Sequence, residues 1–340
     1  MKSIYLFFFA GFLMLGIWAC SKDEMPPTPG QNWVYDPTPQ ELTYPGFFPI
    51  LDIPASNPMT TQGVKLGRML YYDPALHPDS AKACATCHIQ NISFTSEQQA
   101  TEVIPHINLG WSKNFLWLGK VQGKLEDIML FEVKDFFKTD LSKLQNHPDY
   151  PRLFYEAFGT DTITYELAAK ALSQFERTMI SCNSKYDKVL DQNSGVFFTD
   201  EELNGYDLFF TEKADCFHCH GGILFTDNDF HNNALDANPA DGRFEITQAP
   251  FDRGKYKTPT LRNIELTGPY MHDGRFKTLE EVVDFYSEGL QMSETVDPLM
   301  KAVHLGGKHL SPQDKSDLIA FLKTLTDTTY TTNPVLSSPF

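Results

Sequence analysis

The chain of 340 residues carries two copies of one short motif whose cysteines and histidine could attach a cofactor. The first copy is Cys84-Ala85-Thr86-Cys87-His88 and the second is Cys216-Phe217-His218-Cys219-His220. In the spacing C-x-x-C-H, two thiols can form thioethers with the two vinyl groups of one haem, and the adjacent histidine can bind the iron. The sequence therefore predicts two covalently bound c-type haems. The attachment residues would be Cys84, Cys87, Cys216 and Cys219, and the iron ligands would be His88 and His220.

Zinc binding and disulfide formation are the alternatives for these cysteines. Pairs of C-x-x-C motifs that share one zinc ion usually lie about 15–20 residues apart, whereas well over a hundred residues separate the two motifs here. Zinc would also leave both trailing histidines unexplained. A disulfide within C-x-x-C closes a very small loop and restricts little chain entropy. Haem explains more of the residues, and the remaining Cys182 is expected to be a small buried hydrophobe.

The segments around the two motifs indicate helices and repeat each other. Each motif follows G-x-x-L and two aromatic residues, at 67–72 and at 205–210. A capping box at Thr199 and Glu202 predicts the start of the second of these helices. Its buried face is expected to hold Leu203, Tyr206 and Phe210.

A later helix should pack against each of these two. In the first half this is the stretch 165–178, whose inward side is predicted to hold Leu167, Ala168, Ala171, Leu172 and Phe175. In the second half Ser311, Pro312 and Asp314 open the predicted final helix, with the apolar stripe Leu318, Ile319, Leu322 and Leu325. Strand signals are sparse. We therefore expect an all-α fold of two cytochrome c-like haem domains in tandem, at 46–190 and 191–330, followed by a tail at 331–340.

The first 45 residues are expected to lie outside the folded domains. Lys2 and an apolar run from Ile4 to Trp18 are typical of a signal peptide, predicted at 1–19. The segment 17–20 resembles a lipoprotein cleavage box, in which Cys20 becomes the acylated N-terminus. Residues 20–45 are rich in proline and predict a stiff tether. The mature protein is expected in the periplasm, lipid-anchored at the outer membrane, with the cell surface as the alternative location.

Composition excludes two other kinds of partner. The chain has 28 Lys and Arg against 44 Asp and Glu, a formal charge of −16. This balance argues against binding to the phosphate backbone of nucleic acid, which needs clustered cations. After the signal region, no stretch approaches the roughly 20 apolar residues of a spanning helix. Membrane contact is therefore expected only through the lipid anchor.

Three segments of the second half together resemble the bacterial di-haem cytochrome c peroxidase family, which includes the MauG-type enzymes. They are Thr258-Pro259-Thr260-Leu261-Arg262-Asn263, Gly268-Pro269-Tyr270-Met271-His272-Asp273-Gly274 and Leu279-Glu280-Glu281-Val282-Val283-Asp284-Phe285-Tyr286. The resemblance implies that the second haem takes electrons from a small cytochrome c or similar donor and that the first reduces hydrogen peroxide. It also implies a homodimer and a tryptophan between the haems, and Trp117 occupies the matching position.

The resemblance further implies ligands of the second haem iron and of a calcium ion. The sixth iron ligand would be Tyr286, as in the MauG type, with Met271 and Met292 as alternatives. A phenolate favours ferric iron, whereas a thioether raises the reduction potential. Thr267 and Pro269 match residues that hold calcium in the family. Val103 stands where the family supplies an asparagine, although calcium requires oxygen ligands.

The acid-base group of the peroxide site departs from the family pattern. The family places a glutamine and a glutamate after the tryptophan, and those positions fall on Ile128 and Lys138 here. The nearest groups that could move a proton are Glu132, Asp135 and Gln122. His106 is expected beside the first haem or on the surface, rather than as a cap on its iron.

Three functions follow from these residues and from the resemblance. The leading interpretation is an exported di-haem peroxidase that reduces hydrogen peroxide with electrons from a small cytochrome c. A MauG-like enzyme that oxidises a protein substrate is the alternative within the family. A non-catalytic di-haem electron carrier is the third, favoured by the residues Ile128 and Lys138 in the peroxide site.

Overall fold

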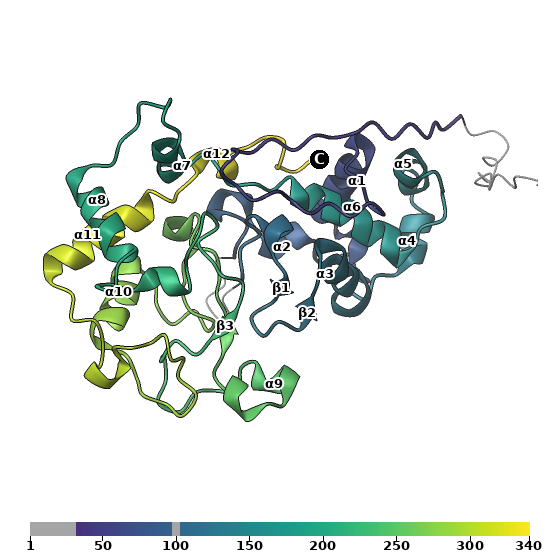
Figure 1. Cartoon of the computed structure of the whole chain (residues 1–340). Coiled ribbons are helices and arrows are strands. Elements are labelled where there is room, and N and C mark those ends of the chain that lie inside the picture. The colour runs from purple at the N-terminus through teal and green to yellow at the C-terminus, as the bar shows by residue number, and fades with distance from the viewer. Residues whose placement is uncertain (1–31, 97–102) are drawn as a thin grey trace, which may run out of the picture. The chain divides into compact units, whose positions relative to one another are not determined.

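The computed structural model describes residues 32–96 and 103–340 (Figure 1). The predicted signal peptide, Cys20 and the first part of the tether lie outside these residues. Residues 34–340 form one compact unit. Among the described residues, no helix is both long enough and apolar enough to cross a membrane.

The described chain is rich in helix and poor in strand, as predicted. The helices of the first half are α1 (Thr61–Tyr72), α2 (Cys84–Cys87), α3 (Leu125–Phe131), α4 (Leu141–Gln145), α5 (Tyr150–Phe158), α6 (Tyr165–Arg177) and α7 (Lys185–Leu190). Those of the second half are α8 (Asp200–Phe209), α9 (Phe244–Thr247), α10 (Leu279–Glu288), α11 (Pro312–Lys323) and α12 (Thr328–Thr331). The strands pair as two antiparallel hairpins, β1 (Asn114–Phe115) with β2 (Val121–Gln122) and β3 (Phe230–His231) with β4 (Tyr256–Lys257).

Each half has its own hydrophobic core, built on one close pair of helices. In the first half α1 packs against α6, and in the second half α8 packs against α11. A glycine lies at each contact, because a β-carbon at Gly67 would collide with the carbonyl oxygen of Ala171 and one at Gly205 with that of Asp317. The two halves therefore repeat one packing arrangement.

The predicted helix starts and inward residues are largely confirmed. Thr164 caps α6, and capping boxes open α8 at Thr199 and α11 at Ser311. Of the residues predicted to face inward from α6, Leu167 is only partly covered and the rest are buried. The helix α11 is not the final one, because α12 follows it.

The buried face predicted for α8 is wrong by part of a turn. Leu203 is exposed, and the buried side holds Gly205, Leu208 and Phe209. Since Gly205 lets α11 approach closely, this side of the helix faces the core. The ring of Tyr206 lies beside this contact, 5.6 Å from that of Phe321.

The two terminal segments are packed more closely than the sequence predicted. Figure 1 shows the C-terminal segment running from α12 toward α1, and its Leu336 is buried in the first core. The Arg68 guanidinium donates to the carbonyl oxygens of Pro334 and Ser337 at 2.7 Å. The tail at 331–340 is therefore part of the first half. In the tether, the Gln40 N–H donates to the Met59 carbonyl and the Thr38 carbonyl accepts from the Thr61 N–H, so this part of the tether is bound to the folded unit.

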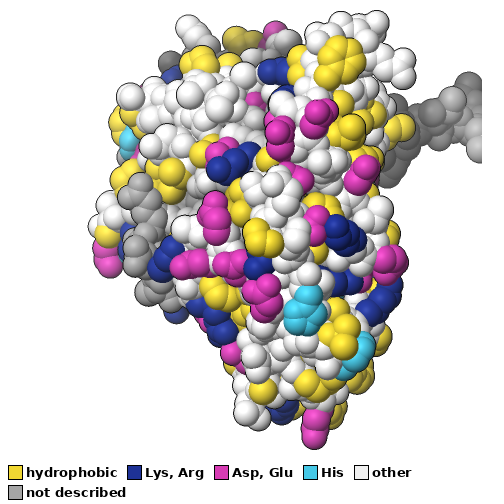
Figure 2. All heavy atoms as spheres, turned by 90° about the vertical axis from the view of Figure 1, so that its left-hand side faces the viewer, with side chains coloured by type: hydrophobic (Ala, Val, Ile, Leu, Met, Phe, Trp, Pro, Cys, Tyr) yellow, Lys and Arg dark blue, Asp and Glu magenta, His cyan; other side chains and the backbone are white. Residues whose placement is uncertain are grey.

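The surface carries mixed charge on the face shown in Figure 2. Lysine and arginine side chains lie among aspartate and glutamate side chains there, with small hydrophobic areas between them. This face therefore offers no continuous basic stripe of the kind that binds a phosphate backbone.

Candidate functional site

The two predicted iron ligands are held in the same way. The His88 Nδ1–H donates to the Phe94 carbonyl at 2.9 Å, and the His220 Nδ1–H donates to the Phe225 carbonyl at 3.2 Å. Both phenylalanines have left-handed backbone conformations, with φ of 57° and 52°, which turn these carbonyls toward the histidines. Each ring therefore keeps its Nε2 atom for a metal.

Burial keeps both imidazoles neutral, which is the form that binds a metal. Burial, with His106 beside it, lowers the pKa of His88 well below its usual range. Burial also lowers the pKa of His220 to about 4. These histidines are thus prepared to act as ligands rather than as surface charges.

The four motif cysteines are free thiols in the described structure. Burial raises the pKa of Cys216 to about 12 and that of Cys84 well above its usual range. No disulfide consumes either pair, and each pair lies next to an anchored histidine. The residues therefore fit covalent attachment of one haem to each half.

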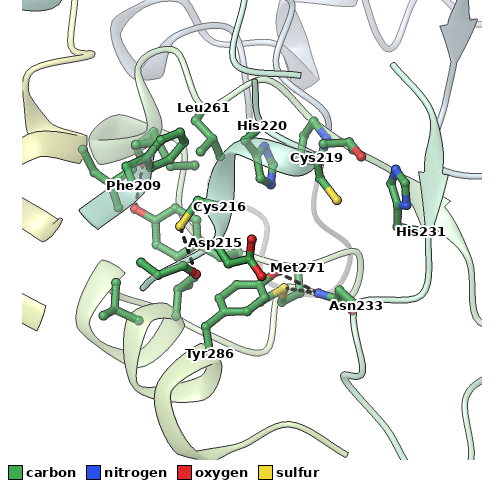
Figure 3. Close-up of a pocket in the computed structure, with 18 of the residues that line it drawn as sticks. Phe209, Asp215, Cys216, Cys219, His220, His231, Asn233, Leu261, Met271 and Tyr286 are labelled. Carbon is green, nitrogen blue, oxygen red and sulfur yellow. Dashed lines mark hydrogen bonds between the residues drawn. The ribbon is translucent and has the colours of Figure 1, made fainter. Parts of the chain in front are cut away.

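A cavity opens beside the second motif (Figure 3). It encloses about 1660 Å³ of empty space, part of which is open to solvent. His220 and Cys219 lie on one side of this cavity, and Tyr286, Met271 and Asn233 lie across from them. A group held by His220 would thus meet Tyr286 or Met271 on its opposite face.

Two of the three predicted sixth ligands reach this cavity. The Asn233 Nδ2 atom donates to the Tyr286 hydroxyl at 3.1 Å and lies 3.5 Å from the Met271 sulfur. Burial raises the pKa of Tyr286 to about 12, although the hydrogen bond from Asn233 opposes this. Met292 is 53% exposed and is not among the cavity-lining residues.

Trp117 connects the two halves. It lies between β1 and β2 of the first half, yet it lines the cavity of the second. Its carbonyl oxygen accepts a hydrogen bond of 2.8 Å from the Lys257 N–H on β4. Arg243 donates to the neighbouring Leu118 carbonyl at 3.0 Å. The tryptophan backbone is therefore fixed by hydrogen bonds from the opposite half.

The predicted acid-base candidates separate in the structure. Glu132 is partly buried and interacts with Cys84 of the first motif. Burial raises the pKa of Glu132 to about 7, with His106 opposing the rise and Glu176 adding to it. Asp135 is exposed, and Gln122 is exposed and donates to Asn114 at 2.7 Å. Of the three candidates, Glu132 is therefore the one that lies near other titratable groups of the first motif.

A local irregularity of the helix positions Glu132. The helix α3 continues as a turn of π-helix at Glu132–Phe136. Turns of π-helix are rare in proteins overall. Those that do occur are often found at functional sites, where the wider turn changes the direction of the side chains that follow. The sequence pattern did not predict it.

The structure also identifies two residues beside His88 whose placement the sequence did not give. The ring of His106 stacks on that of His88, with 3.5 Å between centroids and 23° between planes. Its Nδ1 atom lies 3.3 Å from a carboxylate oxygen of the buried Glu176. His106 therefore lies against the predicted iron ligand His88 itself.

An alignment of the two halves of the sequence with each other could have identified Glu176 as unusual. The end of α6 reads Phe175-Glu176-Arg177-Thr178, and the end of α11 reads Phe321-Leu322-Lys323-Thr324. Phe175 faces Gly67 and Phe321 faces Gly205 at the two helix contacts. In both helices the threonine hydroxyl donates to the phenylalanine carbonyl at 2.6 Å. The signal is that the acidic Glu176 stands where the other half has the apolar Leu322.

Calcium binding at Thr267 and Pro269 stays a prediction. The Thr267 hydroxyl donates to the Ile264 carbonyl at 3.4 Å. Val103, at the position where the family supplies an asparagine, offers no side-chain oxygen.

Comparison with known proteins identifies the family of this chain. The profile of the family described as di-haem cytochrome c peroxidase matches residues 61–195. The chain is 31% identical to the methylamine utilization protein MauG of Methylorubrum extorquens over 290 residues, which cover 80% of each chain. It is 30% identical to the cytochrome c551 peroxidase of Nitrosomonas europaea over 300 residues, covering 82% of this chain and 84% of the relative.

Solved structures agree with the sequence comparisons. A crystal structure of a MauG-like protein associated with microbial copper homeostasis superposes with a TM-score of 0.80 and 31% identity, covering 88% of this chain and 99% of the other. The diheme peroxidase BthA of Burkholderia thailandensis shares the fold at a TM-score of 0.61 and 18% identity, covering 81% of this chain and 88% of the other. The chain belongs to the di-haem cytochrome c peroxidase family and is an oxidoreductase with two c-type haems.

Proposed function

We propose that this protein is an exported peroxidase with a haem domain in each half. A haem held by Cys84, Cys87 and His88 would supply the reduction of hydrogen peroxide. A haem held by Cys216, Cys219 and His220 would receive electrons from a small cytochrome c or similar protein. The observation that carries this proposal is Glu132, a partly buried carboxylate that interacts with Cys84 of the first motif and whose pKa is raised to about 7 by burial.

The chain supplies proton transfer and orientation for this reaction. Reduction of hydrogen peroxide consumes two electrons and two protons and yields two waters. The bound haems supply the electron chemistry. Glu132 accepts a proton from one peroxide oxygen and returns it to the oxygen that leaves as water. A carboxylate whose pKa lies near neutral pH can do both steps, because neither protonation state is strongly favoured. The hydrogen bond to Phe94 keeps His88 oriented meanwhile.

Electron transfer between the halves is assigned to Trp117. Its place in the wall of the second cavity and its attachment to Lys257 support this role. The substitution Trp117→Phe should leave both haems attached and slow transfer between them, measured by stopped-flow absorbance after reduction of the second haem. An unchanged transfer rate would remove Trp117 from the path.

The direct test of the peroxidase is turnover of hydrogen peroxide by the haem-loaded protein, with reduced small cytochrome c as donor. It is run on protein as isolated and on protein with one haem reduced. Fast turnover in either sample supports the proposal. Absence of turnover in both, with two haems present, would favour the electron carrier or a protein substrate.

A MauG-like reaction is the second candidate, and Tyr286 favours it. The tyrosine lies across the cavity from His220, and a phenolate ligand would lower the reduction potential of the second haem. Two of the relatives above are MauG and a MauG-like protein. Tyr286→Met should raise that potential if Tyr286 binds the iron. An unchanged potential and spectrum would assign the sixth position to Met271 or leave it without a protein ligand.

Export and lipid anchoring rest on the residues before the folded unit. The apolar run, Cys20 and the proline-rich segment support a periplasmic lipoprotein on a tether. Labelling with a fatty acid should mark the full chain and should be lost in Cys20→Ala. Retention of the label in that variant would contradict the anchor.

A further inference from the structure

A lysine of the second half is buried without an opposite charge. Lys257 is the last residue of β4 and is 6% exposed. Its Nζ atom donates to the Thr258 carbonyl at 3.4 Å, and no described aspartate or glutamate forms an ion pair with it. Lysine is almost never fully buried unless it is paired, because an unpaired charge is costly to remove from water. The position of Lys257 therefore indicates a negatively charged partner other than these side chains.

The lysine belongs to the wall of the cavity beside the second motif. The other lysine of this wall, Lys308, donates to a carboxylate oxygen of Asp215 at 2.7 Å, so its charge is balanced. Burial lowers the pKa of Lys257 to about 8, with Asp227 opposing the change. The Asp227 carboxylate is engaged by His231, at 2.8 Å. Of the two lysines in the wall, Lys257 is therefore the one whose charge has no direct partner.

The backbone holds Lys257 in place from two sides. In the pairing of β3 with β4, Lys257 lies opposite Phe230. Its N–H donates to the Trp117 carbonyl at 2.8 Å. The Arg243 guanidinium lies over the Phe230 ring, 3.7 Å from its centroid. The burial of the lysine is thus a property of a fixed hairpin and not of a loose loop.

The first half has no charge at the matching position. Lys257 stands two residues before Pro259, and the residue two places before Pro105 is Val103. The asparagines that follow these prolines, Asn263 and Asn108, both take the left-handed conformation, with φ of 58° and 56°. The two segments therefore have a similar course, and that course does not require a lysine.

We propose that Lys257 binds a propionate carboxylate of the haem held by the second motif. This inference rests on the proposed function only in placing a haem in that half. The residues fit the group, because Lys257, Cys219 and His220 line one cavity. Haem carries propionate side chains that end in carboxylates, and a lysine ammonium forms strong, charge-assisted hydrogen bonds with a carboxylate.

Lys257 would act as a positioning residue in two respects. It would orient the haem through the carboxylate, and its N–H already holds the carbonyl of Trp117, the residue proposed for electron transfer. A buried positive charge beside a haem also favours the ferrous state, because ferric iron carries more positive charge and little water screens the repulsion.

The test measures the midpoint potentials of both haems in haem-loaded protein, by redox titration followed with electron paramagnetic resonance. Lys257→Met should lower the ferrous-to-ferric ratio of the second haem about tenfold at a fixed potential, which corresponds to about 59 mV. Lys257→Arg keeps the charge and should stay close to the unchanged protein. The first haem should not shift, because Val103 stands at the matching position there.

The matched control is Lys255→Met. Lys255 is paired with Asp252 at 3.2 Å and is not among the residues that line the cavity. Its removal changes the net charge by the same amount and should shift the second haem far less. Equal shifts in Lys255→Met and Lys257→Met would reduce the effect to net charge and overturn the inference.

Resonance Raman scattering from the second haem shows whether the carboxylate itself is bound. The propionate bending band should shift in Lys257→Met and stay in place in Lys255→Met. A free anion such as phosphate is the other partner that a buried lysine could take. In that case added phosphate would change the potential of the unchanged protein, and the propionate band would not respond to Lys257→Met. That result, or an unchanged potential and band in Lys257→Met, would overturn the inference.

Retention of haem keeps the test decisive where a variant is unstable. Loss of the second haem from Lys257→Met and Lys257→Gln, with retention in Lys257→Arg, would support the binding of the carboxylate. Loss from all three variants would assign Lys257 a role in folding and overturn the inference. The titration uses no peroxide, so absence of turnover would count against the proposed function and not against this inference.

Discussion

The two haem sites share a scaffold and differ in what surrounds the ligand histidine. Each half has a glycine at a helix crossing, a histidine bonded to a phenylalanine carbonyl, and a pair of cysteines before it. Three titratable groups gather at the first site, the buried Glu176 and the partly buried Glu132 and His106. The second site has a cavity with Tyr286 and Met271 opposite His220.

This difference separates two kinds of chemistry. Proton transfer needs titratable groups near the reacting atoms, and the first site has them. Electron transfer needs an aromatic path, and Trp117 in the wall of the second cavity is the residue that we propose for it. A repeated scaffold can thus carry different reactions because the side chains around the ligand differ.

The largest expected effect tests the chemistry of the first site. Glu132→Gln should lower peroxide turnover roughly 10²–10⁴-fold, because the amide cannot accept a proton. In the unchanged protein, turnover should fall as the pH drops below about 7, where Glu132 becomes protonated, and this limb should vanish in the variant. The matched control is Asp135→Asn, an exposed carboxylate on the same π-helical turn. Equal losses in both variants, or an unchanged pH profile, would remove Glu132 from the reaction.

The next effect tests whether the halves share their helix packing. Gly67→Ala and Gly205→Ala should each lower the free energy of unfolding by about 3 kcal/mol, because the added methyl group meets a backbone carbonyl of the facing helix. Gly46→Ala is the control, since nothing lies within 4 Å of its β-carbon position. Denaturant unfolding measures all three. A harmless substitution at either glycine would show that its helices do not pack as described.

A smaller effect tests the C-terminal tail, which covers the first half alone. Leu336→Ala should cost about 2 kcal/mol, the lower end for a buried leucine, because the segment lies at the edge of the core. Val335→Ala changes the exposed neighbour and should stay within about 0.5 kcal/mol. Thermal unfolding compares the two. Equal stability would mean that the tail is not part of the first core.

The smallest effect compares equivalent helix caps. Thr164 caps α6 and Ser311 caps α11, each accepting a hydrogen bond from the backbone N–H three residues later. Replacing either by alanine should cost about 1 kcal/mol in urea unfolding. A clearly unequal pair of values would show that the two caps are not equivalent in energy.

The sequence determined whatever depends on short spacing or helical period. The C-x-x-C-H motifs predicted the haem attachment residues and the ligands, because five adjacent residues suffice for that chemistry. Capping boxes placed the starts of α8 and α11, because a cap is local. The signatures at 258–286 were enough to identify the family, which the comparisons confirmed.

The tertiary structure alone decided which residues meet across long separations. It left Asp135 exposed and Glu132 of the same π-helical turn partly buried, placed the ring of His106 against that of His88, and brought Glu176 from α6 to meet His106. It also returned the C-terminal tail to the first half and turned Leu203 of α8 toward solvent. These outcomes depend on which helix faces which, and close packing at the glycines fixes that only once both halves are folded.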